Sequence, residues 1–399
     1  MVKLRTLSII KLLFLFTTYL AFSQSSVYDS LNYGGRWRTF MTHLPSGYVA
    51  SKKYPLVLAF HGGSPLGYQS IQYQSQLSSK ADSAGFIVGY PEGVQIAGNR
   101  TWNAGGCCNP AVSFNIDDIG FVNSLLNNLF STRSIDTTRV YATGFSNGAL
   151  LCYRLANQLT YRFAAIAPVA GDLMYYPWNP SRTIPIIAFH SYKDMNIQYY
   201  GGATIGSTGT YFPPQDSILG IIATNYLCQV RKQTLFHDSV KYDHFKYSNC
   251  SGNSIIEQYI SYDGEHSWPG GLSLSGTSVS QQFNATFLMW EFFKNYKTTG
   301  INAVIAEKEL SPYSLTLLQN FPNPFNPSTT IRYSLSTPTD VRLSIVDALG
   351  REIATLIDAQ QSPGEKEVQW NVRDAASGVY FCILRAGNIV VSKKLLLTK

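Results

Sequence analysis

The chain has 399 residues, which is enough for two or three domains, and 45% of them are hydrophobic while only 14% are charged. This composition allows a sizeable core and excludes wholesale disorder. The formal net charge is +7, or +4 once the three basic residues of the leader described next are removed, so the positive charge is too small and too scattered to indicate nucleic-acid binding.

Residues 1–23 are predicted to be a secretory signal peptide. A short apolar run at residues 12–22 follows the three basic residues Lys3, Arg5 and Lys11. Small residues occupy both key positions of Ala21-Phe22-Ser23, immediately before Gln24. A membrane-spanning helix needs about 20 apolar residues, so this run is too short to be one. We therefore expect a secreted protein without a transmembrane segment in its mature form.

Short apolar strands alternate with helices from residue 24 to residue 298, which predicts a mainly parallel sheet with helices on both faces. Strands are expected at residues 35–44, 54–60, 85–90, 139–142, 163–170, 184–189 and 255–260. Helices are expected at residues 69–84, from the acidic pair Asp117-Asp118 onward, at 149–158 and at 281–296. The last helix is expected to bury Phe287, Leu288, Trp290 and Phe293.

The run Gly144-Phe145-Ser146-Asn147-Gly148 lies between one of these strands and one of these helices. This is the layout of a nucleophile elbow, in which a serine on a sharp strand-to-helix turn exposes its hydroxyl above a sheet. The glycines allow the strand and the helix to approach closely. Three fixed positions occur by chance in about one chain in eight of this length. It is therefore the flanking strand and helix that favour a catalytic serine over a plain glycine-rich turn.

A serine nucleophile needs a base, and the base needs an acid that fixes its tautomer. In this architecture the acid and then the histidine follow the serine in the chain. His266 is the predicted base because it lies in a glycine-bounded loop after the last strand. Two other histidines precede the serine, one follows it too closely, and two lie in a polar stretch where they are expected to be solvated: His43 and His61, His190, and His237 and His244.

Asp194 is the predicted acid, because it follows the strand at residues 184–189 within one short loop. Asp172 ends the preceding strand and is an alternative. Asp263 lies three residues from His266 and is expected to stabilise its own turn.

The tetrahedral intermediate of acyl transfer carries an oxyanion that needs preorganised N–H donors. One expected donor is the backbone N–H of Asn147, directly after the serine. The other is the backbone N–H of Gly63 or its neighbour, in the run His61-Gly62-Gly63-Ser64 after an early strand.

Several side chains on the same edge of the predicted sheet are candidates for contact with substrate. His61, Trp102 and Trp268 are the predicted substrate-binding residues, and Tyr199, Tyr200 and Tyr262 lie in loops of the same edge. Their aromatic faces could stack on sugars or aryl acids, although core or loop packing is the alternative for each of them.

Six cysteines fit an oxidising compartment. Cys228 and Cys250 bracket a polar segment that looks irregular, and we expect them to form a disulfide. One of the adjacent residues Cys107 and Cys108 pairs with Cys152, or both are free. No Cys-x-x-Cys or spaced histidine set supports a metal site. Cys382 is expected to be a lone strand residue.

The pattern of hydrophobic residues changes near residue 299. Residues 299–316 are predicted to be a linker. Three prolines at residues 322–327 forbid a helix. After them, short strands with a period of two recur at regular spacing up to residue 399. Residues 317–399 are therefore predicted to form a small all-β, immunoglobulin-like sandwich.

Six segments carry a resemblance to a known family: residues 58–63, 85–93, 102–108, 117–121, 144–148 and 264–270. Through them, residues 34–296 resemble the secreted polyhydroxybutyrate-depolymerase-like and feruloyl/acetylxylan esterase group of α/β-hydrolases. The resemblance implies Ser146 as nucleophile, Asp194 as acid and His266 as base, with neither metal nor cofactor. That family usually has His-Gly-Thr-x-Asp before the acid, whereas this chain has His190-Ser191-Tyr192-Lys193-Asp194. The bulky Tyr192 could therefore reshape the cleft.

A second resemblance rests on residues 320–327, 347–352, 377–380 and 393–397. Through these segments, residues 317–399 look like the C-terminal sorting domain of type IX secretion cargo. The resemblance implies export across an outer membrane and the secretion machinery as a partner.

The sequence thus predicts a secreted serine esterase, located outside the cell or on its surface, that removes feruloyl or acetyl groups from plant polysaccharide. A polyhydroxybutyrate or polyester depolymerase is the main alternative. A peptidase on the same fold and a non-catalytic carbohydrate-binding surface protein are further alternatives.

Overall fold

The computed structural model describes residues 26–203, 209–274, 276–298, 316–318, 320–335, 338–347, 350–372, 375–386 and 389–398. The predicted signal peptide, and all of the predicted linker except residue 316, lie outside the described residues. The chain divides into two compact units, Met1–Gly300 and Ile301–Lys399. Each unit has hydrophobic core clusters of its own.

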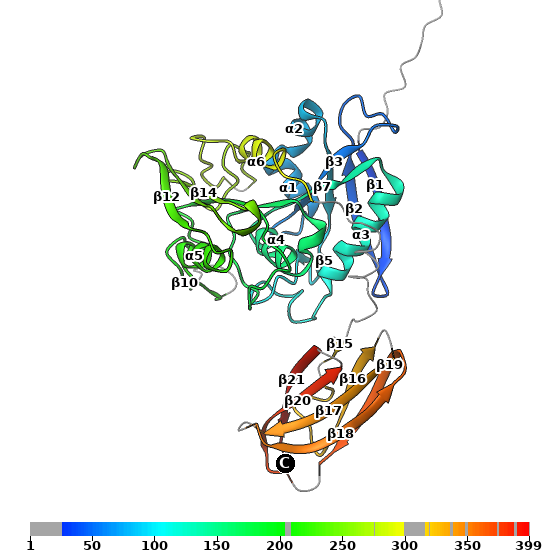
Figure 1. Cartoon of the computed structure of the whole chain (residues 1–399). Helices are drawn as coiled ribbons and strands as arrows, with labels where there is room; N and C mark the ends of the chain where they lie inside the picture. The colour runs from blue at the N-terminus through cyan, green and yellow to red at the C-terminus, as the bar shows by residue number, and fades with distance from the viewer. Residues whose placement is uncertain are drawn as a thin grey trace, which may run out of the picture. The chain divides into compact units, whose positions relative to one another are not determined.

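The first unit is built on a ten-stranded sheet with the strand order β1-β2-β4-β3-β7-β8-β9-β14-β13-β12 (Figure 1). The strands from β4 to β14 in this order are parallel, and the remaining pairings on either side are antiparallel. The strands are β1 Ser26–Tyr33, β2 Arg36–His43, β3 Tyr54–Phe60, β4 Ile87–Pro91, β7 Ile135–Phe145, β8 Ala165–Val169, β9 Ile186–Ser191, β12 Val230–His237, β13 Tyr242–Ser248 and β14 Ile256–Ser261.

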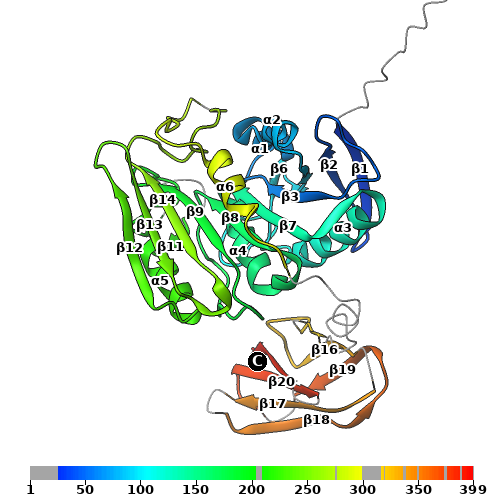
Figure 2. The same ribbon diagram turned by 45° about the horizontal axis from the view of Figure 1, so that its top comes forward.

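Helices cover both faces of this sheet, and Figure 2 shows α1 and α2 on one side with α3 and α4 on the other. Side chains alternate along a strand, so Leu58 and Phe60 of β3 pack toward α4 while Val57 and Ala59 pack toward α1. The helices are α1 Tyr68–Ser75, α2 Leu77–Ala84 and α6 Ala285–Phe293 on the first face, and α3 Asp118–Thr132, α4 Asn147–Gln158 and α5 Gln215–Asn225 on the second.

Smaller elements lie in the loops of the first unit. Two short hairpins, β5 Val94–Ile96 with β6 Asn99–Thr101 and β10 Gly202–Ala203 with β11 Tyr211–Phe212, stand apart from the main sheet. Two short 3-10 turns complete the unit, η1 Thr160–Arg162 and η2 Ser251–Asn253.

The structure corrects three details of the sequence prediction. The helix expected at residues 69–84 is two helices, because Gln76 adopts a left-handed conformation with φ of 55° between α1 and α2. The segment between Cys228 and Cys250 is not irregular but forms the hairpin β12–β13. Phe287 is not buried: 52% of its surface is exposed.

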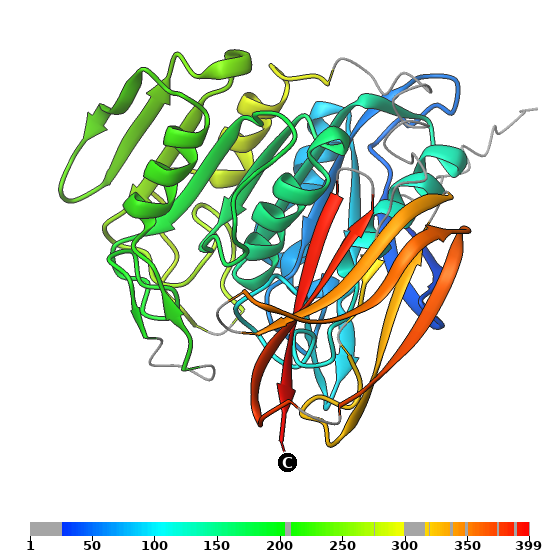
Figure 3. The same ribbon diagram turned by 60° about the horizontal axis from the view of Figure 1, so that its bottom comes forward.

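The second unit consists of two small antiparallel sheets, with strand orders β15-β16-β19 and β18-β17-β20-β21. Figure 3 shows its strands in orange to red. Side chains from both sheets enclose one core, which includes Ile331, Leu343, Trp370 and Leu384. The strands are β15 Thr316–Leu317, β16 Ser328–Leu335, β17 Thr339–Asp347, β18 Glu352–Gln361, β19 Gly364–Asn371, β20 Gly378–Ala386 and β21 Ile389–Leu397. The predicted fold class, an α/β unit followed by a small all-β sandwich, is confirmed.

Candidate active site

Ser146 occupies a strained turn between β7 and α4. Its φ of 54° and ψ of −121° are unusual for a residue with a side chain, and its N–H is held by Val169 O at 3.0 Å. A Cβ atom on Gly148 would lie 2.1 Å from Phe60 O, and one on Gly144 would lie 2.4 Å from Gly148 O. The two glycines of the pentapeptide are therefore required by close backbone approach.

Asp194 and His266 form a hydrogen-bonded pair. The distance from His266 Nδ1 to Asp194 Oδ2 is 2.8 Å, and the other carboxylate oxygen accepts the backbone N–H groups of Asn196 and Ile197, each at 2.9 Å. The Asp194 side chain is fully buried, while 12% of the His266 side chain is exposed. An imidazole bonded in this way through Nδ1 leaves Nε2 free to exchange a proton with a nucleophile.

The electrostatics of this pair favour an ionised acid. Burial alone raises the pKa of Asp194, but the charge and hydrogen bond of His266, with smaller effects of His190 and the Ile197 N–H, hold that pKa below its usual value. His190 lies deeper, with Nε2 at 2.7 Å from Ile197 O and 3.8 Å from the Asp194 carboxylate. Burial lowers the pKa of His190, so its ring is neutral at pH 7 and its Nε2–H donates a hydrogen bond to Ile197 O.

Ser146 and His266 line the same cavity, which has a volume of about 640 Å³. Ser146 follows β7, Asp194 follows β9 and His266 follows β14, and these strands run parallel in one sheet. Their carboxyl ends lie at one edge, where ligands bind in sheets of this type. The three residues proposed from chain order are thus brought to one place.

The two alternative acids lie elsewhere. Asp172 is buried, accepts the Leu173 N–H at 2.9 Å, and has its pKa raised by burial. Asp263 accepts the side-chain amide of Gln282 at 3.2 Å. Among the described residues, no hydrogen bond joins either of them to His266.

Gly63 and Asn147 also line the cavity, one from the loop after β3 and the other from the first residue of α4. Within the described part of the chain, neither backbone N–H has a hydrogen-bond partner. Two unpaired N–H groups beside a candidate nucleophile suit an oxyanion. A Cβ on the neighbouring Gly62 would lie 3.2 Å from Ser146 Cβ, so this loop approaches the elbow closely.

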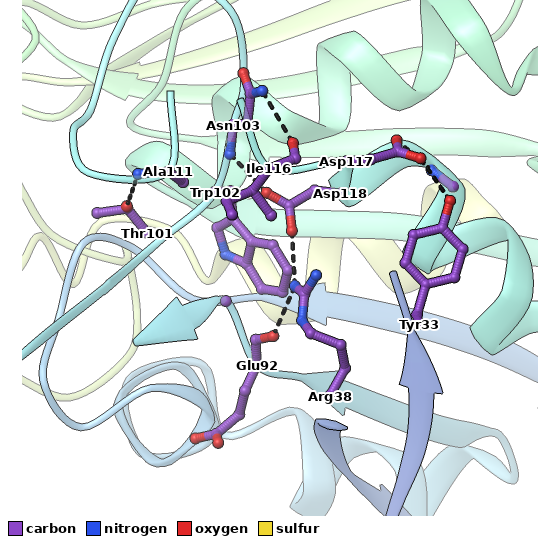
Figure 4. Close-up of polar contacts among 12 residues, drawn as sticks. Tyr33, Arg38, Glu92, Thr101, Trp102, Asn103, Ala111, Ile116, Asp117 and Asp118 are labelled. Atoms are coloured by element: carbon purple, nitrogen blue, oxygen red, sulfur yellow. Dashed lines mark hydrogen bonds and ion pairs between the residues drawn. The ribbon is translucent and has the colours of Figure 1, made fainter. Parts of the chain in front are cut away.

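A buried ion pair supports the loop that faces the elbow (Figure 4). Arg38 donates to Asp118 Oδ1 at 2.7 Å and to Glu92 O at 3.1 Å, and Asp118 Oδ2 accepts the backbone N–H of Asn103 at 2.7 Å. Only 4% of the Arg38 side chain and none of the Asp118 side chain is exposed. Burial raises the pKa of Asp118, and the Arg38 charge opposes that rise. The buried ion pair therefore fixes the segment Trp102–Asn103 through the Asn103 N–H.

The three predicted substrate-binding residues do not line the cavity. His61, Trp102 and Trp268 have no exposed surface. The indole N–H of Trp102 donates to His61 O at 2.9 Å, and that of Trp268 donates to Thr286 Oγ1 at 2.9 Å. Each indole needs a partner for its N–H and finds it in the interior, so these residues position loops instead of touching a ligand.

His61 is held between two backbone groups. Its Nδ1 lies 2.6 Å from Gly62 O, and its Nε2 accepts the Gly93 N–H at 2.9 Å. Burial lowers the pKa of His61 to about 4, so the ring is neutral at pH 7. It braces the loop that carries Gly63.

The structure also corrects the expected cysteine pairing. Cys107 and Cys108 form a disulfide with each other, and Cys152 is a buried free thiol. Cys108 has φ of 80°, which lets the two adjacent side chains meet, whereas Cys152 lies on α4 within the core. Cys228 and Cys250 are joined by a disulfide, and Cys382 is a buried free thiol on β20.

Several residues that line the cavity could not be singled out from the sequence. They are Cys107, Cys108, Asn109, Asn196, Ile197, Thr210, Phe212 and Leu274. The described residues contain no cluster of three or more His, Cys, Asp or Glu that could hold a metal ion. No helix among the described residues is long and apolar enough to cross a membrane.

A mainly parallel sheet between two layers of helices, with a serine at a strained strand-to-helix turn, defines the α/β-hydrolase fold. Residues 39–176 match the family model described as Esterase PHB depolymerase, and residues 319–398 match the Secretion system C-terminal sorting domain. These two matches confirm both resemblances noted in the sequence. The sorting domain indicates an extracellular or cell-surface protein, as predicted.

Individual relatives are esterases. The chain is 31% identical over 172 residues to Feruloyl esterase B of Piromyces equi, covering 41% of this chain and 31% of that protein. It is 29% identical over 262 residues to Poly(3-hydroxyalkanoate) depolymerase C of Paucimonas lemoignei, covering 63% of this chain and 56% of that protein. The chain thus spans about a third of the first relative and just over half of the second.

A solved structure, the acetyl xylan esterase from Aspergillus awamori, superposes with a TM-score of 0.44 at 14% identity. The superposition covers 60% of this chain and 94% of that one.

Proposed function

We propose that the protein is a secreted carboxylic-ester hydrolase with Ser146 as its nucleophile. His266 takes the hydroxyl proton of Ser146 as the oxygen attacks the ester carbonyl, and later gives that proton to the leaving alcohol. Asp194 holds the imidazole in the tautomer with hydrogen on Nδ1 and stabilises the positive charge that forms. Water, activated by His266, then cleaves the acyl-enzyme and restores Ser146.

The developing oxyanion is bound by the backbone N–H groups of Gly63 and Asn147. Both belong to rigid elements, the tight loop after β3 and the first turn of α4, so the donors need little reorganisation during the reaction. The positive end of the α4 dipole lies at the same place and adds to the stabilisation.

The observation that carries this proposal is the 2.8 Å hydrogen bond between Asp194 and His266 beside a cavity that Ser146 also lines. An imidazole with an ordered carboxylate on one nitrogen, and a serine within the same cavity, is an arrangement for nucleophilic acyl transfer. A non-catalytic binding protein has no need of a buried Asp–His pair at its ligand site.

The proposed substrate is a plant polysaccharide that carries feruloyl or acetyl esters, in line with the relatives that bear those names. A polyester such as a poly(3-hydroxyalkanoate) is the second candidate, favoured by the matching family description and by the Paucimonas relative. Both substrates are polymers with many ester groups, which are side groups in the polysaccharide and main-chain links in the polyester.

The proposed domain organisation has an export signal at each end of the esterase domain. Residues 1–23 form a signal peptide, residues 24–298 the esterase domain, residues 299–316 a linker and residues 317–399 the sorting domain. The type IX secretion machinery is the partner proposed for that last domain.

Labelling with a fluorophosphonate probe tests the serine mechanism. The purified protein is expected to bind the probe, and Ser146→Ala is expected to lose both the label and ester hydrolysis. An unlabelled wild-type protein that binds polysaccharide would instead favour a binding module. Rates of release from methyl ferulate, acetylated xylan and poly(3-hydroxybutyrate) then rank the substrates, and release from none of them would contradict the esterase proposal.

A further inference from the structure

The disulfide between Cys107 and Cys108 forms part of the cavity wall. Both residues line the same cavity as Ser146 and His266, and Cys107 is only 3% exposed. A bond between adjacent cysteines closes a small ring through the peptide bond that joins them. It adds almost no loop-closure constraint to the unfolded chain, because no residues lie between the two cysteines. Its value to the fold as a cross-link is therefore small.

The backbone that carries this disulfide is held in place. The N–H of Gly106 donates to Met174 O at 2.9 Å, and a Cβ on Gly105 would lie 2.4 Å from the same oxygen. The preceding Asn103 is bonded to the buried Asp118, which is paired with Arg38 (Figure 4). Cys107 and Cys108 thus line the cavity from a backbone segment that is held in place.

The rest of the cavity suits a ligand with an apolar ring. Ile197, Phe212 and Leu274 supply further apolar wall, and the volume of about 640 Å³ is far larger than an acetyl group requires. Sulfur is polarizable and makes favourable contacts with aromatic rings at about 5 Å. A disulfide offers two such atoms side by side, without a hydrogen that needs an acceptor.

We propose that the Cys107–Cys108 disulfide is a substrate-contacting surface that binds the ring of an aromatic acyl group and so favours aryl esters over acetyl esters. This inference rests on the proposed esterase function and deepens it. It assigns specificity to a pair of residues that takes no part in the proton transfers. The competing explanation is a purely structural brace for the loop.

The experiment compares two methyl esters that share their alcohol and differ only in the acyl group, methyl ferulate and methyl acetate. In the variant Cys107→Ser/Cys108→Ser, the ratio of kcat/KM for methyl ferulate to kcat/KM for methyl acetate is expected to fall about 2- to 10-fold. The fall is expected in KM for methyl ferulate. The matched control is Cys228→Ser/Cys250→Ser, which removes the disulfide that does not line the cavity and should leave the ratio unchanged.

A brace and a contact surface give different results. Loss of the brace would lower kcat/KM for both esters by the same factor and leave the ratio where it was, which would overturn the proposal. An unchanged rate for both esters would overturn it as well.

Reduction of the wild-type protein covers the case in which the serine variant does not fold. A phosphine reductant converts the disulfide to two thiols, and mass spectrometry with thiol alkylation reports which pair has opened. Opening of Cys107–Cys108 should lower the same ratio, and reoxidation should restore it. A ratio that does not respond to opening of this pair would contradict the proposal.

Failure of the esterase proposal can be told apart from failure of this one. If the wild-type protein hydrolyses neither ester, calorimetric titration with ferulate still compares wild type with the double serine variant. Weaker binding by the variant supports the contact surface, and equal binding refutes it.

Discussion

The side chain of Asn147 is bonded to both backbone groups of Trp102, although 45 residues separate them in the chain. Trp102 N donates to Asn147 Oδ1 at 2.6 Å, and Asn147 Nδ2 donates to Trp102 O at 3.1 Å. Asn147 also supplies one of the two proposed oxyanion donors. A single residue therefore links the elbow to the loop that leads to Cys107 and Cys108.

Removal of that link is expected to destabilise the first unit. Asn147→Ala leaves the buried N–H of Trp102 without a partner and leaves the C=O of Trp102 with the Ala104 N–H as its remaining partner, which is expected to lower the free energy of unfolding by about 1–3 kcal/mol. Denaturant unfolding at pH 7 measures the change. The control is Asn225→Ala, since the amide of Asn225 makes its hydrogen bond on an exposed face of α5 and its loss is expected to cost under about 0.5 kcal/mol. Equal losses in the two variants would contradict the inferred link.

Substitution of Asp194 by asparagine is expected to lower kcat by about 10⁴ while the protein stays folded. The amide preserves the shape of the side chain but no longer selects the tautomer with hydrogen on His266 Nδ1. Initial rates on a soluble ester measure the effect. Asp263→Asn is the matched control, because Asp263 lies three residues from His266 without bonding to it. A loss of similar size in the control would point to the wrong acid.

The stability of the protein is expected to fall in mild acid because of His61. Its pKa is about 4 in the folded state and about 6.5 in the unfolded chain, so between these values the unfolded chain binds more protons. Stability is then lost as the pH falls below 6.5, and the contribution of His61 is about 2 kcal/mol between pH 7 and pH 5.

This pH effect can be isolated by comparison with His61→Gln. The variant lacks the titrating ring, so its free energy of unfolding should change by about 2 kcal/mol less between the two pH values than that of the wild-type protein. His190 is present in both proteins and its contribution cancels. Parallel pH profiles for the two proteins would show that His61 is not the titrating group.

Replacing only one partner of the ion pair between Arg38 and Asp118 is expected to lower the free energy of unfolding strongly. Arg38→Met leaves a buried carboxylate without its partner, and the expected loss is about 3–5 kcal/mol in the free energy of unfolding. Replacing both residues, as in Arg38→Met/Asp118→Leu, is expected to cost less than the single change, which a double-mutant cycle would measure.

Lys294→Met provides the comparison on the surface of the same unit. Lys294 pairs with Glu291, and the two side chains are 48% and 39% exposed, so the loss is expected to stay below about 1 kcal/mol. If Arg38→Met cost no more than this, the buried pair would not hold the loop.

The central strands could be predicted closely because their burial is complete. All seven residues of β3, Tyr54–Phe60, are buried, and a strand covered on both faces leaves a continuous apolar run in the sequence. The start of α3 could be predicted for a local reason as well: the Asp117 side chain caps the helix by accepting the Gly120 N–H at 2.9 Å. Such signals depend on nearby residues alone.

The break at Gln76 and the hairpin β12–β13 depend on distant partners and left no such signal. The strand at residues 230–237 lies at the edge of the sheet and the strand at residues 242–248 lies next to it, and both mix polar and aromatic side chains. Their period is further blurred by register shifts within the pairing.

The candidate site shows the same division. Chain order was enough to propose Ser146, Asp194 and His266, because parallel strands place their carboxyl ends together. The sequence could not predict which loop side chains line the cavity, because a tryptophan in a loop can equally well contact a ligand or pack in the core. Trp102 and Trp268 are core residues, and the wall is made instead by residues such as Cys108 and Phe212.

In the second unit, Leu317 of β15 and Leu397 of β21 belong to the same hydrophobic cluster. The two ends of this unit are therefore joined through its own core. We expect residues 317–399, fused to an unrelated protein, to fold around this core, and the sorting role proposed above predicts that the fused protein would be exported with them.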